Sequence, residues 1–122
     1  MEELISAETA KLAKEKGFVW ICRNVWTVFN SEDNHTFEPK IPNNFNRVGV
    51  QNSVSAPTQS QLQKWLREVH NIQVYVYSST ADAKGLPIDW IYDGSVRLDR
   101  RNGLETFEEA LEQGLQEALK QI

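Results

Sequence analysis

The stretch from Pro57 to Tyr77, PTQSQLQKWLREVHNIQVYVY, decides the fold class. Thr58 followed three residues later by Gln61 is a capping box, which is typical of a helix start. Apolar residues then recur at the i, i+3, i+4, i+7 spacing of one buried helix face: Leu62, Trp65, Leu66 and Val69. A strand pattern follows, in which apolar and polar residues alternate: Ile72, Val74 and Val76 against Gln73, Tyr75 and Tyr77. A helix that runs directly into a strand predicts a mixed fold.

Two further helices are predicted at the ends of the chain. The first covers Ser6 to Lys16, because Ser6 is a good N-cap, lysines occupy the last turn and Gly17 is a stop signal. The last follows Thr106 and carries one apolar stripe: Phe107, Ala110, Leu111, Gly114, Leu115, Ala118, Leu119 and Ile122. We interpret the stripe as core that packs on a sheet, with a homodimer seam as the alternative. Ile122 on the stripe predicts a docked C-terminus.

The remaining strands complete the predicted fold. Phe18 to Phe29 alternates with apolar residues on both faces, which indicates one covered strand with a bulge at Asn24. Ile88 to Tyr92 is another strand, and Asp93-Gly94 predicts a hairpin turn into a return strand from Val96 to Asp99. We predict an α+β fold in which a mainly antiparallel sheet of three to five strands is covered on one face by helices. The predicted order is α-β-(β)-α-β-β-β-α.

One long segment lacks a clear period. Between Asn30 and Ala56 the composition shifts to Asn, Ser, Pro and Asp, and only Phe45, Val48 and Val50 suggest a short strand. Long irregular segments in compact domains often carry function, so residues 30–56 are a candidate for partner contact. An ordered but inert excursion with one hidden strand is the other interpretation.

Composition places the chain in a broad class. Its 122 residues are 40% hydrophobic and 25% charged, as in one average globular domain covering residues 1–122. The single Cys22 cannot form an internal disulfide, which favours a reducing compartment. The N-terminus has no apolar segment of a signal peptide, and no run approaches the ~18 apolar residues of a membrane span. We therefore expect a soluble, cytoplasmic protein without a membrane partner.

Charge argues against duplex DNA as a partner. Lys and Arg number 13 against 17 Asp and Glu, for a net charge of -4. Arg97, Arg100 and Arg101 form the one basic cluster in the sequence. A phosphate contact is one interpretation of this cluster, and a solvated hairpin end is the favoured one.

Catalytic and metal-binding patterns are missing from the sequence. His35 lies beside Glu32 and Asp33 but lacks a second ligand at a suitable spacing, and the helix dipole explains His70 at a helix C-terminus. No phosphate-loop, dinucleotide or nucleophile-elbow motif occurs. We therefore predict no enzyme activity, no cofactor and no metal.

Aromatic residues give the best candidate binding site. Tyr75, Tyr77, Trp90 and Tyr92 fall on neighbouring predicted strands, with Arg97 on the hairpin partner and Arg100 and Arg101 nearby. On a shared sheet face they would form a platform for a base or a peptide. Because Trp90 and Tyr92 share parity with Ile88, the alternative is that this pair belongs to the core.

Three blocks carry a resemblance to a known family: ISAETAKLAKEKGF from Ile5, SAPTQSQLQKWLREVHNI from Ser55 and FEEALEQGLQEAL from Phe107. They cover about half of the chain and resemble small hypothetical proteins of Bacteroides-type bacteria and their phages and prophages. The resemblance implies a phage or prophage origin and the cytoplasm of a bacterial host cell. It implies no catalytic residue.

Two functions follow as expectations. The first is a non-enzymatic phage or prophage accessory protein that binds a host protein. The second is a protein that binds or sequesters a small, nucleotide-like ligand. An enzyme of an unrecorded kind ranks last, because no acid, base and nucleophile cluster in the sequence.

Overall fold

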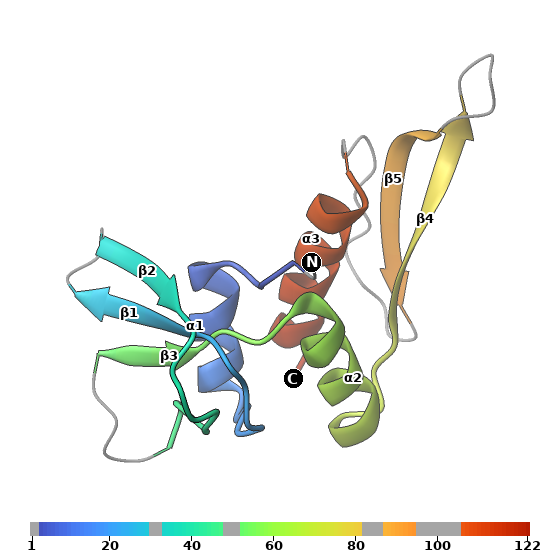
Figure 1. Cartoon of the computed structure of the whole chain (residues 1–122). Coiled ribbons are helices and arrows are strands. Elements are labelled where there is room, and N and C mark those ends of the chain that lie inside the picture. Colours follow the sequence, from blue (N-terminus) through green and yellow to red (C-terminus); the bar gives the residue numbers. More distant parts are fainter. Residues whose placement is uncertain (1–2, 30–32, 48–51, 82–86, 95–105) are drawn as a thin grey trace. The chain divides into compact units, whose positions relative to one another are not determined.

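The structure is a computed structural model that describes residues 3–29, 33–47, 52–81, 87–94 and 106–122. Its elements, in chain order, are α1 (Ala7–Glu15), β1 (Val25–Phe29), β2 (Asp33–Phe37), β3 (Ser53–Ser55), α2 (Gln59–Val69), β4 (Val74–Ala81), β5 (Pro87–Gly94) and α3 (Phe107–Lys120). The fold is α+β, as predicted, and the described strands pair antiparallel. They form two sheets rather than one, with orders β2-β1-β3 and β4-β5 (Figure 1).

The chain divides into two compact units, unit 1 (residues 1–61) and unit 2 (residues 62–122). The buried apolar residues of unit 1 are Ile5, Ala10, Ala13, Phe18, Cys22, Val25, Val54 and Ala56. Those of unit 2 are Leu62, Trp65, Leu66, Ile72, Val74, Ala110, Leu111, Leu115, Ala118 and Leu119. A single domain over residues 1–122 stays a prediction.

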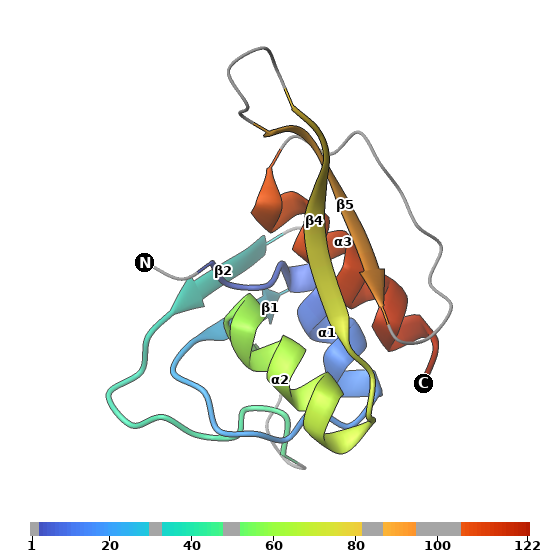
Figure 2. The same cartoon turned by 90° about the vertical axis from the view of Figure 1, so that its right-hand side faces the viewer.

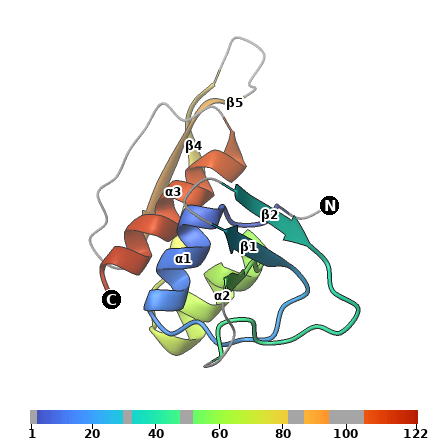
Figure 3. The same ribbon diagram turned by 90° about the vertical axis from the view of Figure 1, so that its left-hand side faces the viewer.

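Helix α1 forms where the sequence predicts it. The Ser6 Oγ accepts a hydrogen bond from the Thr9 N–H at 3.2 Å and so caps the first turn. Gly17 adopts a φ of 92°, a left-handed conformation in which a side chain would be strained, and the chain leaves the helix there. The buried face consists of Thr9, Ala10 and Ala13, and these small residues let α1 lie close to β3 (Figure 1). Figure 3 shows α1 and strand β1 of the same sheet from the other side.

The predicted strand from Phe18 to Phe29 is wrong in its first half, because β1 begins only at Val25. β2 pairs with Val25–Phe29 and β3 with residues 25–27, so neither neighbour extends the ladder upstream. Val19 and Ile21 are exposed rather than covered. Cys22 forms an isolated bridge with Asn43 instead. Asn24 precedes the strand and is not a bulge.

The segment from residue 30 to residue 56 contains two strands, β2 and β3, and neither lies where Phe45, Val48 and Val50 suggested one. β2 has the sequence DNHTF, in which no apolar alternation marks a strand. His35 therefore lies in β2, opposite Thr27, and not in a loop. Phe45 belongs to a turn and not to a strand, while Val48 and Val50 lie outside the described residues.

Asn46 joins three parts of unit 1 through its side-chain amide. Its Nδ2 donates to the Phe18 carbonyl at 2.8 Å, and its Oδ1 accepts from the Ser55 N–H at 2.9 Å. The hydroxyl of buried Ser55 in turn accepts from the Phe45 N–H at 3.0 Å. These bonds satisfy backbone groups that the short sheet leaves without a ladder partner.

Helix α2 confirms the helix that the sequence predicts after Thr58. The Thr58 Oγ1 accepts from the Gln61 N–H at 3.1 Å, and Leu62, Trp65 and Leu66 are buried. Val69, predicted to share this face, is exposed because the helix ends there. At the helix end the Ile72 N–H donates to the Leu66 carbonyl, and Asn71 adopts a left-handed conformation with a φ of 57°.

Strands β4 and β5 form a twisted antiparallel pair (Figure 2). Val74 is buried, whereas Tyr75 and Tyr77 are exposed, so the predicted alternation is confirmed. The predicted turn at Asp93-Gly94 is wrong, because both residues belong to β5 and pair with Tyr75 and Val74. The two strands therefore pair over a longer stretch than the sequence predicts. The return strand from Val96 to Asp99 lies outside the described residues.

Helix α3 packs against both strands of this pair (Figures 1 and 2). The Thr106 Oγ1 accepts from the Glu109 N–H at 3.0 Å, as the predicted cap requires. The buried stripe consists of Ala110, Leu111, Gly114, Leu115, Ala118 and Leu119, so its interpretation as core is confirmed. Phe107 and Ile122 at its two ends are exposed. The Ile122 N–H donates to the Leu119 carbonyl, and a docked C-terminus stays a prediction. The homodimer seam stays a prediction.

Candidate functional site

Two neighbouring tyrosines of β4 are exposed. Tyr75 and Tyr77 are 47% and 36% exposed, and their ring centroids lie 6.2 Å apart with an angle of 32° between the ring planes. Residues two apart on a strand share a face, and Val74 on the other face of β4 is buried. The tyrosines therefore lie on the strand face opposite Val74. We call Tyr75, Tyr77 and the paired positions Ile91 and Asp93 the tyrosine face.

The strand register divides the four predicted aromatic positions between two faces. Tyr92 pairs with Val76 and Trp90 with Ser78, and these positions alternate with Tyr75 and Tyr77. The tyrosine face therefore holds two of the four aromatic positions and not all of them. The alternative interpretation, in which Trp90 and Tyr92 belong to the core, stays a prediction, because the register gives only their positions along the strand. Arg97, Arg100 and Arg101 lie outside the described residues.

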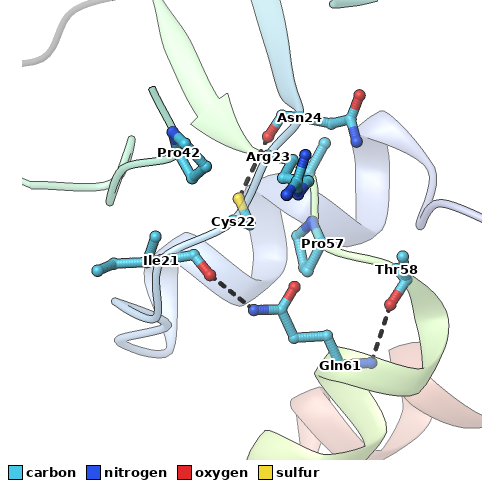
Figure 4. Close-up of a pocket in the computed structure, with 9 residues that line it drawn as sticks. Ile21, Cys22, Arg23, Asn24, Pro42, Pro57, Thr58 and Gln61 are labelled. Atoms are coloured by element: carbon cyan, nitrogen blue, oxygen red, sulfur yellow. Dashed lines mark hydrogen bonds between the residues drawn. The ribbon is translucent and has the colours of Figure 1, made fainter. Parts of the chain in front are cut away.

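A pocket of about 420 Å³ in unit 1 was not predicted from the sequence. It is formed by residues before β1, by Pro42, and by the segment between β3 and α2 with the first turn of α2 (Figure 4). We call it the Arg23 pocket, and its lining residues are Ile21, Cys22, Arg23, Asn24, Pro42, Ala56, Pro57, Thr58 and Gln61. No motif marks it, because its residues come from three separate parts of the chain.

Polar groups of the Arg23 pocket are only partly engaged. The Arg23 guanidinium donates to Glu38 Oε1 at 3.1 Å, and both side chains are mostly exposed, so this ion pair contributes little to stability. A full capping box requires a hydrogen bond from the Thr58 N–H to the Gln61 side chain. The Gln61 side chain points elsewhere. Its Nε2 instead donates to the Ile21 carbonyl at 2.8 Å and ties α2 to the segment before β1.

Cys22 is the thiol in the wall of this pocket. It is 5% exposed, and its Sγ donates to the Asn24 carbonyl at 3.2 Å. Burial raises the pKa of the Cys22 thiol above its ordinary value of 9.0, and the Ser55 side chain and Ala56 backbone only partly oppose this shift. The thiol is thus protonated at neutral pH and is a poor nucleophile.

This pKa shift predicts a loss of stability at alkaline pH. Above pH 9.0 the unfolded chain releases the Cys22 proton while the folded chain keeps it, so the unfolded state binds fewer protons. The free energy of unfolding then falls as pH rises from 9.0 toward the folded pKa, by at most about 1.4 kcal/mol per pH unit. Urea unfolding of the wild type and Cys22→Ala at a series of pH values measures this effect. We expect their difference to be constant below pH 8 (about one unit under the unfolded pKa) and to narrow above pH 9.0. A constant difference across the whole range would contradict the raised pKa.

Among the residues that the structure describes, neither histidine belongs to a group of potential metal ligands. His70 packs edge-on against Trp65, with ring centroids 4.6 Å apart, which gives it a structural role. Across the described ranges, no group of three or more His, Cys, Asp or Glu side chains is placed to hold a metal ion. None of the helices described combines the length and the apolar character that a bilayer span requires.

Comparison with known proteins adds no identity. No protein-family model, no curated protein and no solved structure matches the chain. The resemblance to hypothetical proteins of Bacteroides-type bacteria and their phages stays a prediction from the sequence.

Proposed function

We propose that the chain is a non-enzymatic binding protein that engages a partner protein through the tyrosine face. The observation that carries this proposal is the pair of adjacent exposed rings, Tyr75 and Tyr77, on a strand whose other face is packed. Tyrosine is enriched at protein interfaces, because its ring buries a large apolar area while its hydroxyl keeps a hydrogen-bond partner.

The strand makes this surface suitable for recognition. β4 pairs with β5 along its length and α3 packs on the pair, so the backbone that carries the rings is held in place. A tyrosine on such a backbone has two side-chain torsions to fix on binding, which keeps the entropic cost low. The net charge of -4 favours a partner with a neutral or basic surface.

The biological setting follows from the sequence resemblance alone. It supports a phage or prophage accessory protein that acts in the cytoplasm of a bacterial host cell. The partner would then be a host protein. This setting is part of the proposal and is tested together with it.

Loss of both rings is expected to abolish partner binding. Tyr75→Ala/Tyr77→Ala should reduce capture of the partner from a lysate of a Bacteroides-type bacterium at least tenfold, since hot-spot aromatics typically contribute more than 1.4 kcal/mol each. Affinity capture with quantitative mass spectrometry measures this. The fold should survive, because both side chains are exposed.

Matched variants make the test specific. Tyr75→Phe/Tyr77→Phe keeps both rings and should retain most of the binding, whereas Arg67→Ala on the exposed side of α2 should leave it unchanged. Equal capture by the wild type and by the double alanine variant would refute binding through the tyrosine face.

A small, nucleotide-like ligand is the second candidate function. The rings of Tyr75 and Tyr77 lie side by side with a modest tilt, and such a ledge suits the stacking of one base. Native mass spectrometry of the purified chain would show extra mass for a retained ligand. A nucleotide at a hundredfold excess over its Kd would also raise the free energy of unfolding by about 2.7 kcal/mol. A bare species without stabilisation by nucleotides favours the partner protein.

A further inference from the structure

The Arg23 pocket combines an apolar body with a cation and an amide. Pro42 and Ile21 lie on one side and Pro57 and Thr58 on the other, with Gln61 below them (Figure 4). A volume of about 420 Å³ falls within the range of small-molecule sites. All lining residues belong to unit 1, whereas the tyrosine face belongs to unit 2.

Arg23 retains donors for a ligand. One of its guanidinium N–H groups reaches Glu38, and the others have no partner among the residues that the structure describes. A guanidinium presents five N–H donors in a planar fork that fits a carboxylate bidentately. The Arg23 and Glu38 side chains are 72% and 59% exposed, so their weak pairing is easily replaced by a ligand carboxylate.

Gln61 supplies an acceptor of fixed orientation. Because its Nε2 donates to the Ile21 carbonyl, the amide is oriented and Oε1 remains on the side of Pro57 (Figure 4). Within the described part of the chain, no group donates a hydrogen bond to Oε1. A ligand N–H therefore has an acceptor in the same pocket as the guanidinium that would receive the carboxylate.

We propose that the Arg23 pocket binds an acylated amino acid group: a carboxylate on Arg23, an amide N–H on Gln61 Oε1, and a short apolar side chain between Pro42 and Pro57. The same chemistry occurs in a free N-acyl amino acid and at the C-terminal residue of a peptide chain. Glu38 competes with the ligand carboxylate for the guanidinium and so weakens binding.

Titration of the full chain with N-acetyl-L-leucine, followed by two-dimensional amide NMR, tests the proposal. We expect saturable shifts at Ile21, Arg23 and Gln61, with a Kd of about 1 mM for a ligand of this size. N-acetyl-L-leucine methylamide lacks the carboxylate and L-leucine lacks the acylated nitrogen, so both should bind at least about tenfold more weakly. Equal shifts with the methylamide, or no saturable shift at these residues, would overturn the proposal.

Variants of two exposed side chains give matched controls. Arg23→Ala should weaken binding about tenfold, and Arg23→Lys should also weaken it, because lysine keeps the charge but loses the bidentate fork. Glu38→Gln should strengthen binding about twofold to threefold by removing the competing carboxylate. Unchanged affinity in Arg23→Ala contradicts the site.

A longer probe distinguishes the two sources of the ligand. The peptide acetyl-Gly-Ser-Gly-Leu with a free C-terminus presents the same terminal residue as N-acetyl-L-leucine. Tighter binding of the peptide assigns the pocket to the C-terminus of another chain. Equal or weaker binding assigns it to a free acylated amino acid. Binding of neither compound refutes both.

Discussion

Replacing Trp65 with alanine is expected to lower the free energy of unfolding by about 3–5 kcal/mol, the usual cost of removing a large buried aromatic side chain. Trp65 is 2% exposed and lies between Leu62 and Leu66 on the buried face of α2. Its ring also packs edge-on against His70 at the helix end. The truncation removes this aromatic contact and leaves a cavity that the helix cannot fill. Urea unfolding followed by far-UV circular dichroism measures the loss.

Two companion variants separate packing from helix propensity. Trp65→Phe keeps an aromatic ring against His70 and should cost clearly less than the alanine variant. Arg67→Ala changes an exposed position of the same helix and should shift stability by less than about 0.5 kcal/mol. A loss below about 1 kcal/mol for Trp65→Ala would show that the ring does not belong to the core.

Asn46→Ala is expected to cost about 2–4 kcal/mol, because two partly buried backbone groups lose their hydrogen-bond partner. The amide donates to the Phe18 carbonyl and accepts from the Ser55 N–H, at 2.8 and 2.9 Å. An alanine methyl group replaces neither bond. The same urea unfolding experiment measures the change, and the Ser55 amide should lose protection against hydrogen exchange.

Asn46→Asp separates the two hydrogen bonds of the Asn46 side chain. The carboxylate still accepts from the Ser55 N–H but cannot donate to the Phe18 carbonyl, so protection at Ser55 should persist while stability still falls. Arg47→Ala, at the exposed neighbouring position, should be close to neutral. If Asn46→Ala were as stable as Arg47→Ala, the two hydrogen bonds of the Asn46 side chain would not contribute to the stability of the fold.

The elements that follow from local signals were predictable. Ser6, Thr58 and Thr106 each accept a hydrogen bond from the residue three positions later, which is the cap that their spacing indicates. The apolar stripe of α3 and the alternation around Val74 and Tyr75 also appear as predicted. In these segments the apolar residues that recur with the helix or strand period are the buried ones, so the local sequence is enough to assign the helix or strand.

The parts that depend on distant partners were not predictable. β2 is polar and β3 has three residues, and both exist because β1 offers them ladder bonds. The exposed residues Val19 and Ile21 show the converse, since their apolar alternation has no neighbour to cover it. Alternation marks a strand only where another strand completes the ladder.

The two candidate sites also differ in how much of each the sequence predicts. Strand alternation places Tyr75 and Tyr77 on one face of β4, and both were predicted from the sequence as binding residues. The register that places Trp90 and Tyr92 opposite Ser78 and Val76 needed the structure. The sequence predicts a turn at Asp93-Gly94, whereas both residues belong to β5 and pair with β4. The Arg23 pocket needed the structure too. Backbone bonds between Cys22 and Asn43 join the segments of Arg23 and Pro42, and the Gln61 side chain donates to the Ile21 carbonyl.

Site-specific photo-crosslinking tests the proposed function most directly. The photoreactive residue p-benzoyl-L-phenylalanine would replace Tyr75, Tyr77 or, as a control on α2, Arg67, and each purified chain would be irradiated in a lysate of a Bacteroides-type bacterium. The proposal predicts one shared crosslinked protein from positions 75 and 77, and its absence from position 67. Crosslinks that are missing at 75 and 77, or that are the same at all three positions, would contradict a partner on the tyrosine face.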